Sequence, residues 1–366
     1  MDRDLLYQLA LSLTPNIGPV QARLLVEHFG NAENIFKAKF SQLLAIEGVG
    51  EVRAKNIKCF DNYSEAESEI DFLKRNSIQP IFITNENYPR RLLNCYDSPI
   101  LLFYKGTANL NSSKIISIVG TRKHTEYGKQ ITEKLISDLA VLNILIVSGL
   151  AYGIDALAHK ISLKNNLPTV GVLAHGLDHI YPYHHTSLAN EMIANGGLLT
   201  EFRSGSKPDK HNFPARNRIV AGMSDATVVI ETGIKGGSMI TAELADGYNK
   251  DVFAFPGKTT DNKSAGCNYL IRKNKAILLT DAQELIEVLG WEEKLKSRKN
   301  NQRVLFIDLT AEEKVIVEIL NEKETVHIDE LFLRSNLSSS KVAAAILHLE
   351  LQNVINSLPG KRYSLT

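Results

Sequence analysis

The sequence predicts an α/β protein with a doubly wound, mostly parallel sheet, preceded by a helical N-terminal domain and followed by a C-terminal winged-helix-like domain. Three observations predict this. Between about residues 80 and 290, strand-length apolar runs alternate with helix-length amphipathic stretches, which is typical of parallel strands joined by helical crossovers. Before residue 75 the apolar residues repeat with helical spacing. After residue 307 come a helix-capping motif, two more helical stretches and a turn-centred hairpin pattern.

The composition is that of an ordinary globular protein and excludes several classes. The 366 residues are 44% hydrophobic and 23% charged, which excludes disorder of the whole chain and is enough for two or three domains. Forty-two Lys and Arg against 41 Asp and Glu leave a net charge of +1, so a polyanionic partner would have to meet a local basic patch. Three widely spaced cysteines, an acidic N-terminus and the lack of a membrane-length apolar run indicate a cytoplasmic protein that does not enter a membrane.

Residues 1–75 are expected to form the helical domain, of the helix-hairpin-helix or SAM-like kind. Two glycine turns, at 17–22 and 46–54, share an apolar residue, a glycine turn and a helix with Ala near its start. This pattern resembles a pair of helix-hairpin-helix units, in which free backbone amides can face a phosphate. A helical bundle whose glycines only form turns fits equally well, so DNA contact by this domain stays open.

Residues 80–290 are expected to form the sheet domain. Six short runs rich in Ile, Val and Leu are predicted as buried strands, at 115–119, 144–147, 169–173, 198–201, 227–230 and 252–255. The segment 81–104 is expected to add an edge strand or a lead-in element. In an open α/β sheet, ligands bind beyond the carboxyl ends of the strands, so the residues that follow each strand are the candidates for a site.

Four loops that follow predicted strands carry residues suited to phosphate. Glycines let a backbone approach closely and leave amides bare at helix starts, and the planar fork of Arg122 matches a phosphate. No GxGxxG or GxxxxGK[ST] motif is present, which disfavours a dinucleotide cofactor and a P-loop ATPase. A row of anion sites along one sheet edge forms a groove, which suits a polymer of phosphates better than one small cofactor. The residues selected come from three of the four loops, and the fourth is the loop after the strand at 169–173: Gly120, Thr121, Arg122, Ser148, Gly149, Gly153, Lys235, Gly237 and Ser238.

The titratable residues near these loops are interpreted as structural. Asp155, near a helix start, is expected to cap that helix rather than to act as an acid or base. His159, four residues further on, is expected to be structural as well. Four histidines within eleven residues lack the spacing of a zinc site and are expected at the surface or facing phosphate: His175, His179, His184 and His185. No catalytic residue, metal or cofactor is assigned.

The densest basic segment is 203–218, which carries five Lys or Arg against one acid. Its core combines an aromatic side chain that can stack on a base, Phe213, with two arginines, Arg216 and Arg218. This makes a plausible platform for a single strand. The same arginines could instead be buried and pair with Glu201, Glu231 or Glu243. We favour phosphate contact, because the bases in the segment outnumber its one acid.

A basic linker is predicted at 291–306 and a winged-helix-like domain at 307–366. Helices are expected at 310–320, 328–334 and 338–352, and a hairpin wing at 354–365. The third helix offers only Lys341 and His348 outside its apolar face, fewer donors than a reader of the major groove usually has. Protein contact or plain packing is at least as well supported there, and only Lys361 and Arg362 in the wing favour DNA.

Five motifs of the central domain, in order, resemble the DNA-processing protein A (DprA/Smf) family. They lie at 117–122, 148–155, 213–222, 237–242 and 255–257. The resemblance covers the whole central domain and also fits both flanking domains. It implies a Rossmann-like protein that binds single-stranded DNA, protects incoming DNA, self-associates as a dimer and helps to load the RecA recombinase during natural transformation. It implies no catalytic turnover.

The resemblance also implies roles for individual residues. Arg122 and the group Arg216, Asn217 and Arg218 fall on the family's strand-binding motifs, with Gly149, Gly153, Gly237 and Ser238 as amide donors. The self-association surface falls on the segment 268–277, with Asn268, Tyr269, Ile271 and Ile277 as candidate interface residues. Asn274 and Lys275 stand where many members have Gly-Ala, and asparagine tolerates the positive φ that such a turn needs.

The alternative is an enzyme. The predicted sheet also resembles Rossmann-like nucleotide hydrolases of the lysine-decarboxylase-like kind, in which a glycine loop and a nearby Glu act on a nucleotide monophosphate. Glu231 or Glu243 could take that part. The chain lacks the PGGxGT run typical of that group, and its basic segment is larger than one phosphate needs. A third alternative is a scaffold that contacts a recombinase and touches DNA only incidentally.

Overall fold

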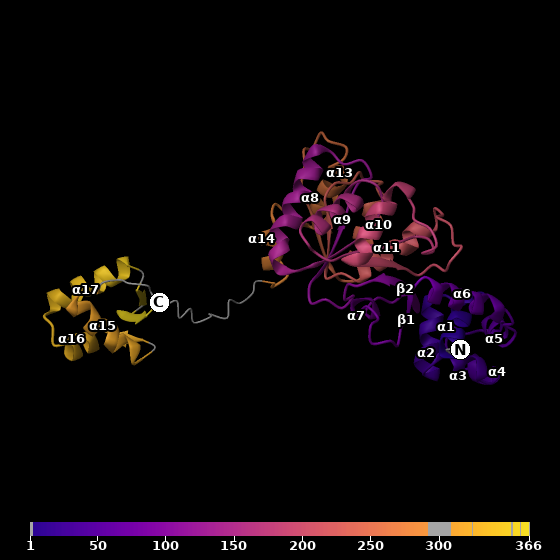
Figure 1. Ribbon diagram of the computed structural model, residues 1–366, viewed down its shortest axis with the longest axis horizontal. Helices are drawn as coiled ribbons and strands as arrows, with labels where there is room; N and C mark the ends of the chain where they lie inside the picture. The colour runs from indigo at the N-terminus through magenta and orange to yellow at the C-terminus, as the bar shows by residue number, and fades with distance from the viewer. Residues whose placement is uncertain (1–2, 292–308, 324, 353, 359, 366) are drawn as a thin grey trace. The chain divides into compact units, whose positions relative to one another are not determined.

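The computed structural model describes residues 3–291, 309–323, 325–352, 354–358 and 360–365 (Figure 1). They fall into two units, Met1–Trp291 and Glu292–Thr366, and each is described by itself. The linker predicted at 291–306 lies outside the described residues, apart from Trp291. The predicted fold class is confirmed: a helical region and a mostly parallel sheet form the first unit, and a winged helix forms the second.

Between residues 3 and 75 the chain forms six helices. They are α1 (Arg3–Leu13), α2 (Pro19–Phe29), α3 (Ala32–Lys37), α4 (Phe40–Leu44), α5 (Glu51–Lys58) and α6 (Tyr63–Arg75). Gly18 and Gly50 are the N-cap residues of α2 and α5, so each glycine turn starts a helix as predicted. The Arg53 side chain donates to the carbonyl oxygens of Asn16 and Gly48, which ties the two turns together.

A nine-stranded sheet within residues 79–278 forms the centre of the first unit, in the order β1-β2-β6-β5-β4-β3-β7-β8-β9. Neighbouring strands from β6 to β9 are parallel. The six predicted strands are present as β3 (Ile115–Val119), β4 (Leu145–Ser148), β5 (Thr169–Val172), β6 (Gly196–Thr200), β7 (Ala226–Val229) and β8 (Asp251–Ala254). The lead-in element is a pair of antiparallel strands, the edge strand β1 (Gln79–Phe82) and its neighbour β2 (Leu101–Gly106). The sequence did not predict β9 (Ile277–Leu278) at the other edge.

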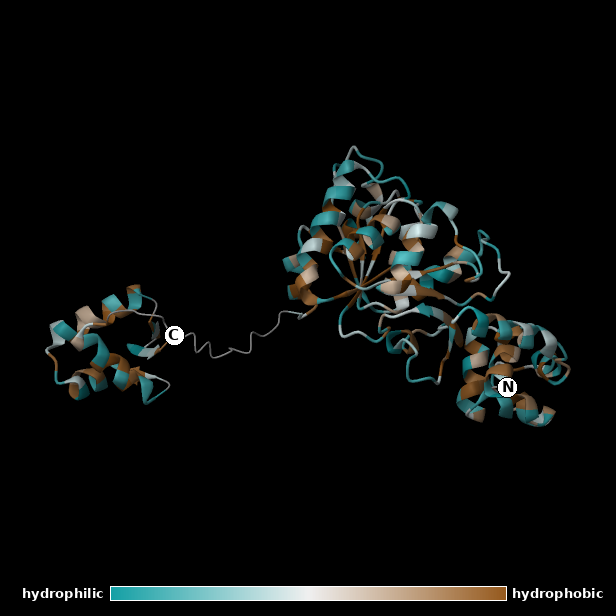
Figure 2. Ribbon diagram, viewed as in Figure 1, coloured by the Kyte–Doolittle hydropathy of each residue, from teal (hydrophilic) through white to brown (hydrophobic). Residues whose placement is uncertain are grey.

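Helices cover both faces of this sheet (Figure 1). Ile116 and Ile118 of β3 pack in one core with α8, α9 and α14, whereas Ile115 and Val119 belong to the core that contains α11, α12 and α13. Because both faces are buried, the strands are continuous apolar runs, and most are brown in Figure 2. The helices are α7 (Arg90–Leu93), α8 (Glu126–Leu139), α9 (Ile154–Lys164), α10 (Thr186–Ala194), α11 (Asn212–Gly222), α12 (Gly237–Gly247), α13 (Ala265–Arg272) and α14 (Ala282–Val288), with 3₁₀ turns at Ala140–Leu142 and Tyr183–His185.

The direction of winding reverses beside β3. From β3 the chain passes through α8 to β4 on one side, and after β6 it returns through α11 to β7 on the other side. The loops that follow β3 and β7 therefore diverge and leave a crevice at the carboxyl edge of the sheet. Folds of this kind bind their ligands at this position.

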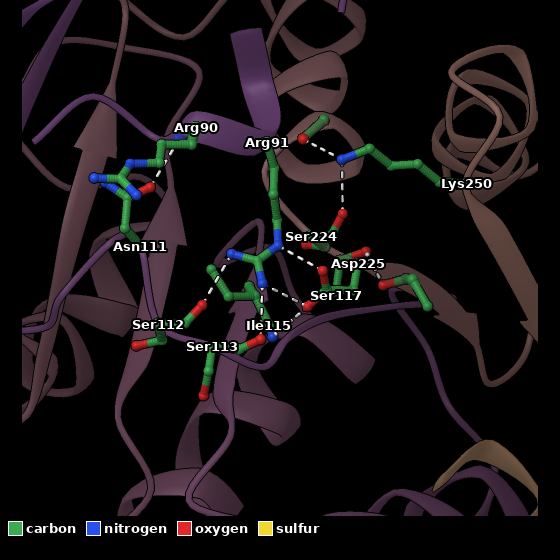
Figure 3. Close-up of polar contacts among 12 residues, drawn as sticks. Arg90, Arg91, Asn111, Ser112, Ser113, Ile115, Ser117, Ser224, Asp225 and Lys250 are labelled. Carbon is green, nitrogen blue, oxygen red and sulfur yellow. Dashed lines mark hydrogen bonds and ion pairs between the residues drawn. The ribbon is translucent and has the colours of Figure 1, made fainter. Parts of the chain in front are cut away.

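At the opposite edge, a polar cluster joins α7 to the starts of β3 and β7 (Figure 3). The Arg91 guanidinium donates to both carboxylate oxygens of Asp225, from Nε at 2.6 Å and from Nη2 at 2.8 Å. The same carboxylate accepts from the Ile115 backbone amide at 2.9 Å. Lys250 lies beside it and donates to the carbonyl oxygen of Ser224 at 2.7 Å. Asp225 thus holds the lead-in segment against the sheet.

Asp225→Asn is expected to lower the free energy of unfolding by about 2 kcal/mol, because the Arg91 guanidinium loses its countercharge. Urea denaturation followed by circular dichroism measures this loss. Asp246→Asn, at an exposed position of α12, is the matched control and should change stability by less than about 0.5 kcal/mol. Equal stability of the two variants would contradict a structural role for Asp225.

In its described residues the second unit is a winged helix. α15 (Ala311–Asn321), α16 (Ile328–Ser335) and α17 (Ser339–Leu351) enclose an apolar core, and β11 (Ile355–Leu358) and β12 (Arg362–Leu365) form the hairpin. The predicted capping box is present, since Thr310 and Glu313 each accept from the other's backbone amide. A short strand that the sequence did not predict, β10 (Val326–His327), pairs with β12. Across the described parts of both units, no helix has the length and apolar character needed to span a membrane.

Candidate functional site

A groove of about 590 Å³ lies at the carboxyl edge of the sheet, in the crevice beside β3. The loops after β3, β4 and β7 and the first turns of α11 and α12 form its walls. Loops far apart in the sequence thus come together as the strand pattern predicts. The candidate residues that line the groove are Gly120, Thr121, Arg122, Gly149, Phe213, Arg216, Asn217, Gly237 and Ser238, and Lys210 and Asp155 line it as well. The candidates outside its lining are Ser148, Gly153, Arg218 and Lys235.

Arg216 is a buried guanidinium at the bottom of this groove, with 5% of the residue exposed. Its Nη1 donates to the carbonyl oxygens of Gly149 and Val172, and its Nε donates to Asn217 Oδ1 at 3.0 Å. Burial lowers its pKa, and the nearby Asp155 carboxylate opposes that shift. Its Nη2 makes no hydrogen bond to any residue that the structure describes. Arg216 is therefore held rigidly and keeps one donor for a ligand in the groove.

Gly149 has a different role from the expected amide donor. A Cβ at this position would lie 2.0 Å from the Arg216 Nη1, so any other residue would displace the guanidinium. The carbonyl oxygen of Gly149 is also one of its acceptors. The glycine in the loop indicated a close approach of some other group. Nothing in the sequence showed that this group is an arginine 67 residues away.

The first turn of α12 supplies backbone amides to the opposite wall of the groove. Gly237 and Ser238 begin the helix, so their amides have no intrahelical acceptor. The Ser238 hydroxyl donates to Thr232 Oγ1 at 2.7 Å, which fixes the turn, and Asn217 Nδ2 donates to the Gly237 carbonyl oxygen. An anion placed here would face the positive end of an eleven-residue helix.

Arg122 and Phe213 form one rim of the groove. The Arg122 guanidinium carbon lies 5.4 Å from the centroid of the Phe213 ring, a cation–π contact. The loop that carries Arg122 is pressed against the start of α9: the Thr121 carbonyl oxygen accepts from the Ile154 amide at 3.1 Å. Gly153, with φ +81°, has no room for a Cβ because the Thr121 carbonyl oxygen would lie 2.2 Å from it. Gly153 therefore positions the loop and does not line the groove.

Arg218 lies outside the groove, and this position corrects its assignment as a phosphate contact. Its Nη2 pairs with Glu201 and its Nη1 donates to the carbonyl oxygen of Asp97. Only 10% of the Arg218 side chain and 15% of the Glu201 side chain are exposed. Burial raises the pKa of Glu201, and Arg218 counteracts that shift. This ion pair corresponds to the alternative given in the sequence analysis, in which the arginines of the basic segment are buried and pair with glutamates.

The other cations of the basic segment also differ in whether they are paired with an acidic side chain. Arg203 pairs with Glu65 of α6, and Ser204 is bonded through its amide and hydroxyl to Glu69 of the same helix. The helical region thus anchors the start of the segment. Lys207 and Lys210 have no ion pair among the described residues, and Lys210 lines the groove. Lys210 was included among the bases of the segment but was not predicted as a site residue. It stands three residues before Phe213, which places it near the same rim.

The carboxylates near the groove are occupied by structural contacts. Glu231 is buried and accepts from the amide and hydroxyl of Thr125 at the start of α8, and it does not line the groove. Glu243 is exposed, 4.0 Å from Lys275. Asp155 lines the groove, but its position differs from the one expected, because Gly153 is the N-cap of α9 and Asp155 accepts from the Ala151 amide. Burial raises the pKa of Asp155, and Arg216 opposes that shift.

Of the four histidines expected at the surface or facing phosphate, His175 and His185 are buried instead, with 1% and 8% of each residue exposed, and their rings are bonded to backbone groups. His159 is buried, shares a hydrogen bond with Thr169 Oγ1 at 2.7 Å, and is kept neutral because burial lowers its pKa to about 3. His175 accepts from the Tyr181 amide at 3.2 Å, and its ring stacks on His179 at 4.7 Å. Throughout the part of the chain that the structure describes, no three His, Cys, Asp or Glu side chains are grouped to hold a metal ion.

The four candidate interface residues lie at the far edge of the sheet. Ile277 belongs to the edge strand β9 and is exposed, as is its neighbour Leu278. Ile271 packs partly against the core, and the Asn268 side chain is bonded to the backbone of Gly257. Tyr269 is partly buried against the core as well, and the Arg272 guanidinium lies over its ring at 5.9 Å. Asn274 has φ +56°, so it forms the left-handed turn in which the sequence expects it to replace glycine.

In the winged helix, the cations of the third helix are already paired. Lys341 of α17 lies 3.0 Å from Glu312, and His348 is bonded to Glu313, both on α15. The exposed positions of α17 include Leu347 and Leu351. This helix therefore presents few donors to a DNA groove.

The chain is similar in sequence to known proteins. A sequence profile described as DNA recombination-mediator protein A matches residues 79–290, one described as the DprA winged helix domain matches 307–361, and one described as the helix-hairpin-helix motif matches 6–70. Protein Smf of Synechocystis sp. is 33% identical over 98% of this chain and 98% of its own length. The DNA processing protein DprA of Bacillus subtilis is 40% identical over 59% of this chain and 73% of its own length.

Two solved structures are similar as well. The X-ray structure of DNA processing protein A from Streptococcus pneumoniae superposes with a TM-score of 0.68 at 32% identity, over 77% of this chain and 97% of that one. The DNA processing protein A of Helicobacter pylori, whose structure was described for its single-stranded DNA binding mode, gives a TM-score of 0.53 at 33% identity, over 58% of this chain and 96% of that one.

Proposed function

Because this chain belongs to the DNA-processing protein A (DprA/Smf) family, we propose that it binds single-stranded DNA in the carboxyl-edge groove, protects incoming strands and helps to load the RecA recombinase onto them during natural transformation. One observation carries the first step. Arg216 is fixed at the bottom of the groove with a donor to spare, between the cations Arg122 and Lys210 and the free amides of α12. These groups recognise phosphate and none of them reads a base, so little sequence preference is expected.

The protein acts by binding, without turnover. If the protein were instead a nucleotide hydrolase, Glu231 or Glu243 would activate the attack on a nucleotide. Glu231 is engaged with Thr125 and does not line the groove, and Glu243 is exposed beside Lys275, which supports the binding role. The three cysteines are free, which supports action in the reducing cytoplasm.

The protein forms a homodimer through the edge that carries β9 and α13. An edge strand with exposed Ile277 and Leu278 offers both unpaired backbone groups and apolar side chains to a second copy. Sedimentation equilibrium is expected to give a dimer, and Ile277→Glu is expected to give a monomer. A wild-type protein that stays monomeric at micromolar concentration would contradict the dimer.

Fluorescence anisotropy with a labelled dT20 strand and the matching duplex tests the binding function. The single strand is expected to bind at least tenfold more tightly, with a log–log salt slope of about −0.7 for each phosphate neutralised. Equal affinity for the two forms would contradict the proposal, and release of free base from nucleotide monophosphates would favour the hydrolase.

RecA filament assembly on the same strand, with and without the protein, tests the loading step. The protein is expected to accelerate assembly, and an unchanged rate of assembly would contradict the loading function.

A further inference from the structure

Among the residues that the structure describes, Asp155 is the one carboxylate in the lining of the groove. It lies in the first turn of α9 and is buried, with 7% of the residue exposed. The other charged side chains of the lining are the cations Arg122, Lys210 and Arg216. A site suited to phosphate thus contains one group that repels its ligand, and binding of phosphate alone gives this group no role.

The Asp155 carboxylate has few contacts for a buried charge. Its Oδ2 accepts from the Ala151 amide at 3.4 Å, which is long for an acceptor that carries a charge, and the Gly149 amide favours the charged form as well. The Ser148 hydroxyl is near but donates its only proton to the Ile118 carbonyl oxygen at 2.6 Å. Asp155 forms no ion pair within the described part of the chain. Little therefore compensates the carboxylate for the water that it loses on burial.

The charged and titratable groups around Asp155 come from α11, from the loops beside it and from α9 itself. Arg216 of α11 is the cation that favours the ionised carboxylate, against burial, which raises the pKa of Asp155. Arg122 of the loop after β3 and Lys210, ahead of α11, line the same groove. His159, one turn further along α9, stays neutral because burial lowers its pKa to about 3. Before a strand is bound, Arg216 is thus the main group that keeps Asp155 charged.

A phosphate in the groove would change this balance. The Nη2 of Arg216 is the donor that remains for a phosphate, so the phosphate and Asp155 would share one guanidinium. A second negative charge close to a carboxyl group favours its protonated form. A protonated Asp155 can donate its O–H to a phosphate oxygen, and hydrogen bonds to an ionised acceptor are the stronger kind. Protonation therefore converts a repelling group into a donor for the ligand.

We propose that Asp155 takes up one proton when a phosphate of the strand enters the groove, so that binding of single-stranded DNA is linked to protonation of this carboxylate. The inference rests on the proposed function and adds a proton to its binding step. The proton comes from the buffer, forms an O–H bond on the carboxylate and returns to the buffer when the strand leaves. Binding is therefore tighter at lower pH, by up to about tenfold for each pH unit over which one full proton is taken up.

Titration calorimetry of the full-length chain with dT20 at pH 7.5, in MOPS and in Tris, tests the proposal. The two buffers differ in the heat of giving up a proton, so the difference between the two binding enthalpies counts the protons taken up. Thymine and phosphodiester groups do not titrate near this pH, so the protons counted go to the protein. Wild type is expected to take up more protons than Asp155→Asn, by at most one.

Asp155→Asn is also expected to bind dT20 about tenfold more tightly than wild type at pH 8, because the repelling charge is gone. This gain should shrink as the pH falls, since wild type then carries the proton as well. Asp138→Asn, at an exposed position of α8, is the matched control and should equal wild type in affinity and in proton uptake.

The outcomes separate the proton linkage from the function it rests on. Histidines that respond to the strand would also take up protons, but wild type and Asp155→Asn share them, so the difference between the two belongs to Asp155. Equal uptake by the two proteins, or none by wild type, would overturn the linkage while strand binding stands. If Asp155→Asn does not fold, Asp155→Ser measures the same difference. If wild type does not bind dT20, the proposed function fails and the linkage fails with it.

Discussion

Replacing Arg122 and Lys210 together by alanine is expected to weaken single-stranded DNA binding about 100-fold. Both side chains line the groove, and neither forms an ion pair with any residue that the structure describes. Their charges are therefore available to phosphates, and each charge-assisted contact contributes roughly 1.5 kcal/mol. The log–log salt slope should become less negative by about 1.4, because two phosphates are no longer neutralised.

The measurement is anisotropy with dT20 over a salt series. The matched control is Lys74→Ala with Lys134→Ala, two exposed lysines on α6 and α8 that do not line the groove. The control pair is expected to keep the wild-type slope, and both double variants should unfold at the wild-type urea concentration. A groove variant with an unchanged slope would show that Arg122 and Lys210 do not touch the strand.

Arg218→Ala is expected to lower the free energy of unfolding by about 3 kcal/mol, because it leaves the buried Glu201 carboxylate without its partner. The loss should depend on pH. Burial already raises the pKa of Glu201, and removal of Arg218 raises it further above the unfolded value. A raised folded-state pKa gives stability at low pH that is lost as pH rises through it, so the deficit should be smaller at pH 5 than at pH 8.

Urea denaturation of Arg218→Ala at both pH values measures this. Arg218→Met combined with Glu201→Leu removes both charges and is expected to recover most of the stability. The DNA-binding salt slope of the Arg218→Ala protein that remains folded should equal that of wild type. A stable Arg218→Ala protein with a flattened slope would instead restore Arg218 to the phosphate site.

The buried strands and the edge that carries the site were predictable from the sequence because parallel strands covered on both faces are continuous apolar runs. β3 was predicted to the residue, from 115 to 119. β9 was not, because a two-residue edge strand has no period to detect. The row of glycine loops after the strands predicted the groove for a topological reason, since carboxyl ends of parallel strands share one edge.

The roles of single charged residues were less predictable, because their partners are distant in sequence. Counting five bases against one local acid favoured phosphate contact at Arg218, but Glu201 comes from the end of β6 and pairs with it. Glu65, which pairs with Arg203, lies 138 residues away in the helical region. Arg216 is buried beneath a glycine that no local pattern connects to it. A local charge count identified the basic segment and could not show which of its members face the groove.

The central claim is that a single strand lies along the carboxyl edge of the sheet, over the groove. Photocrosslinking with a 4-thiothymidine strand, followed by mass spectrometry of the crosslinked peptides, tests it most directly. The crosslinks are expected on peptides that contain Phe213, and they should be lost when salt releases the strand. Crosslinks confined to α2 and α5, or to α17 of the winged helix, would contradict the claim.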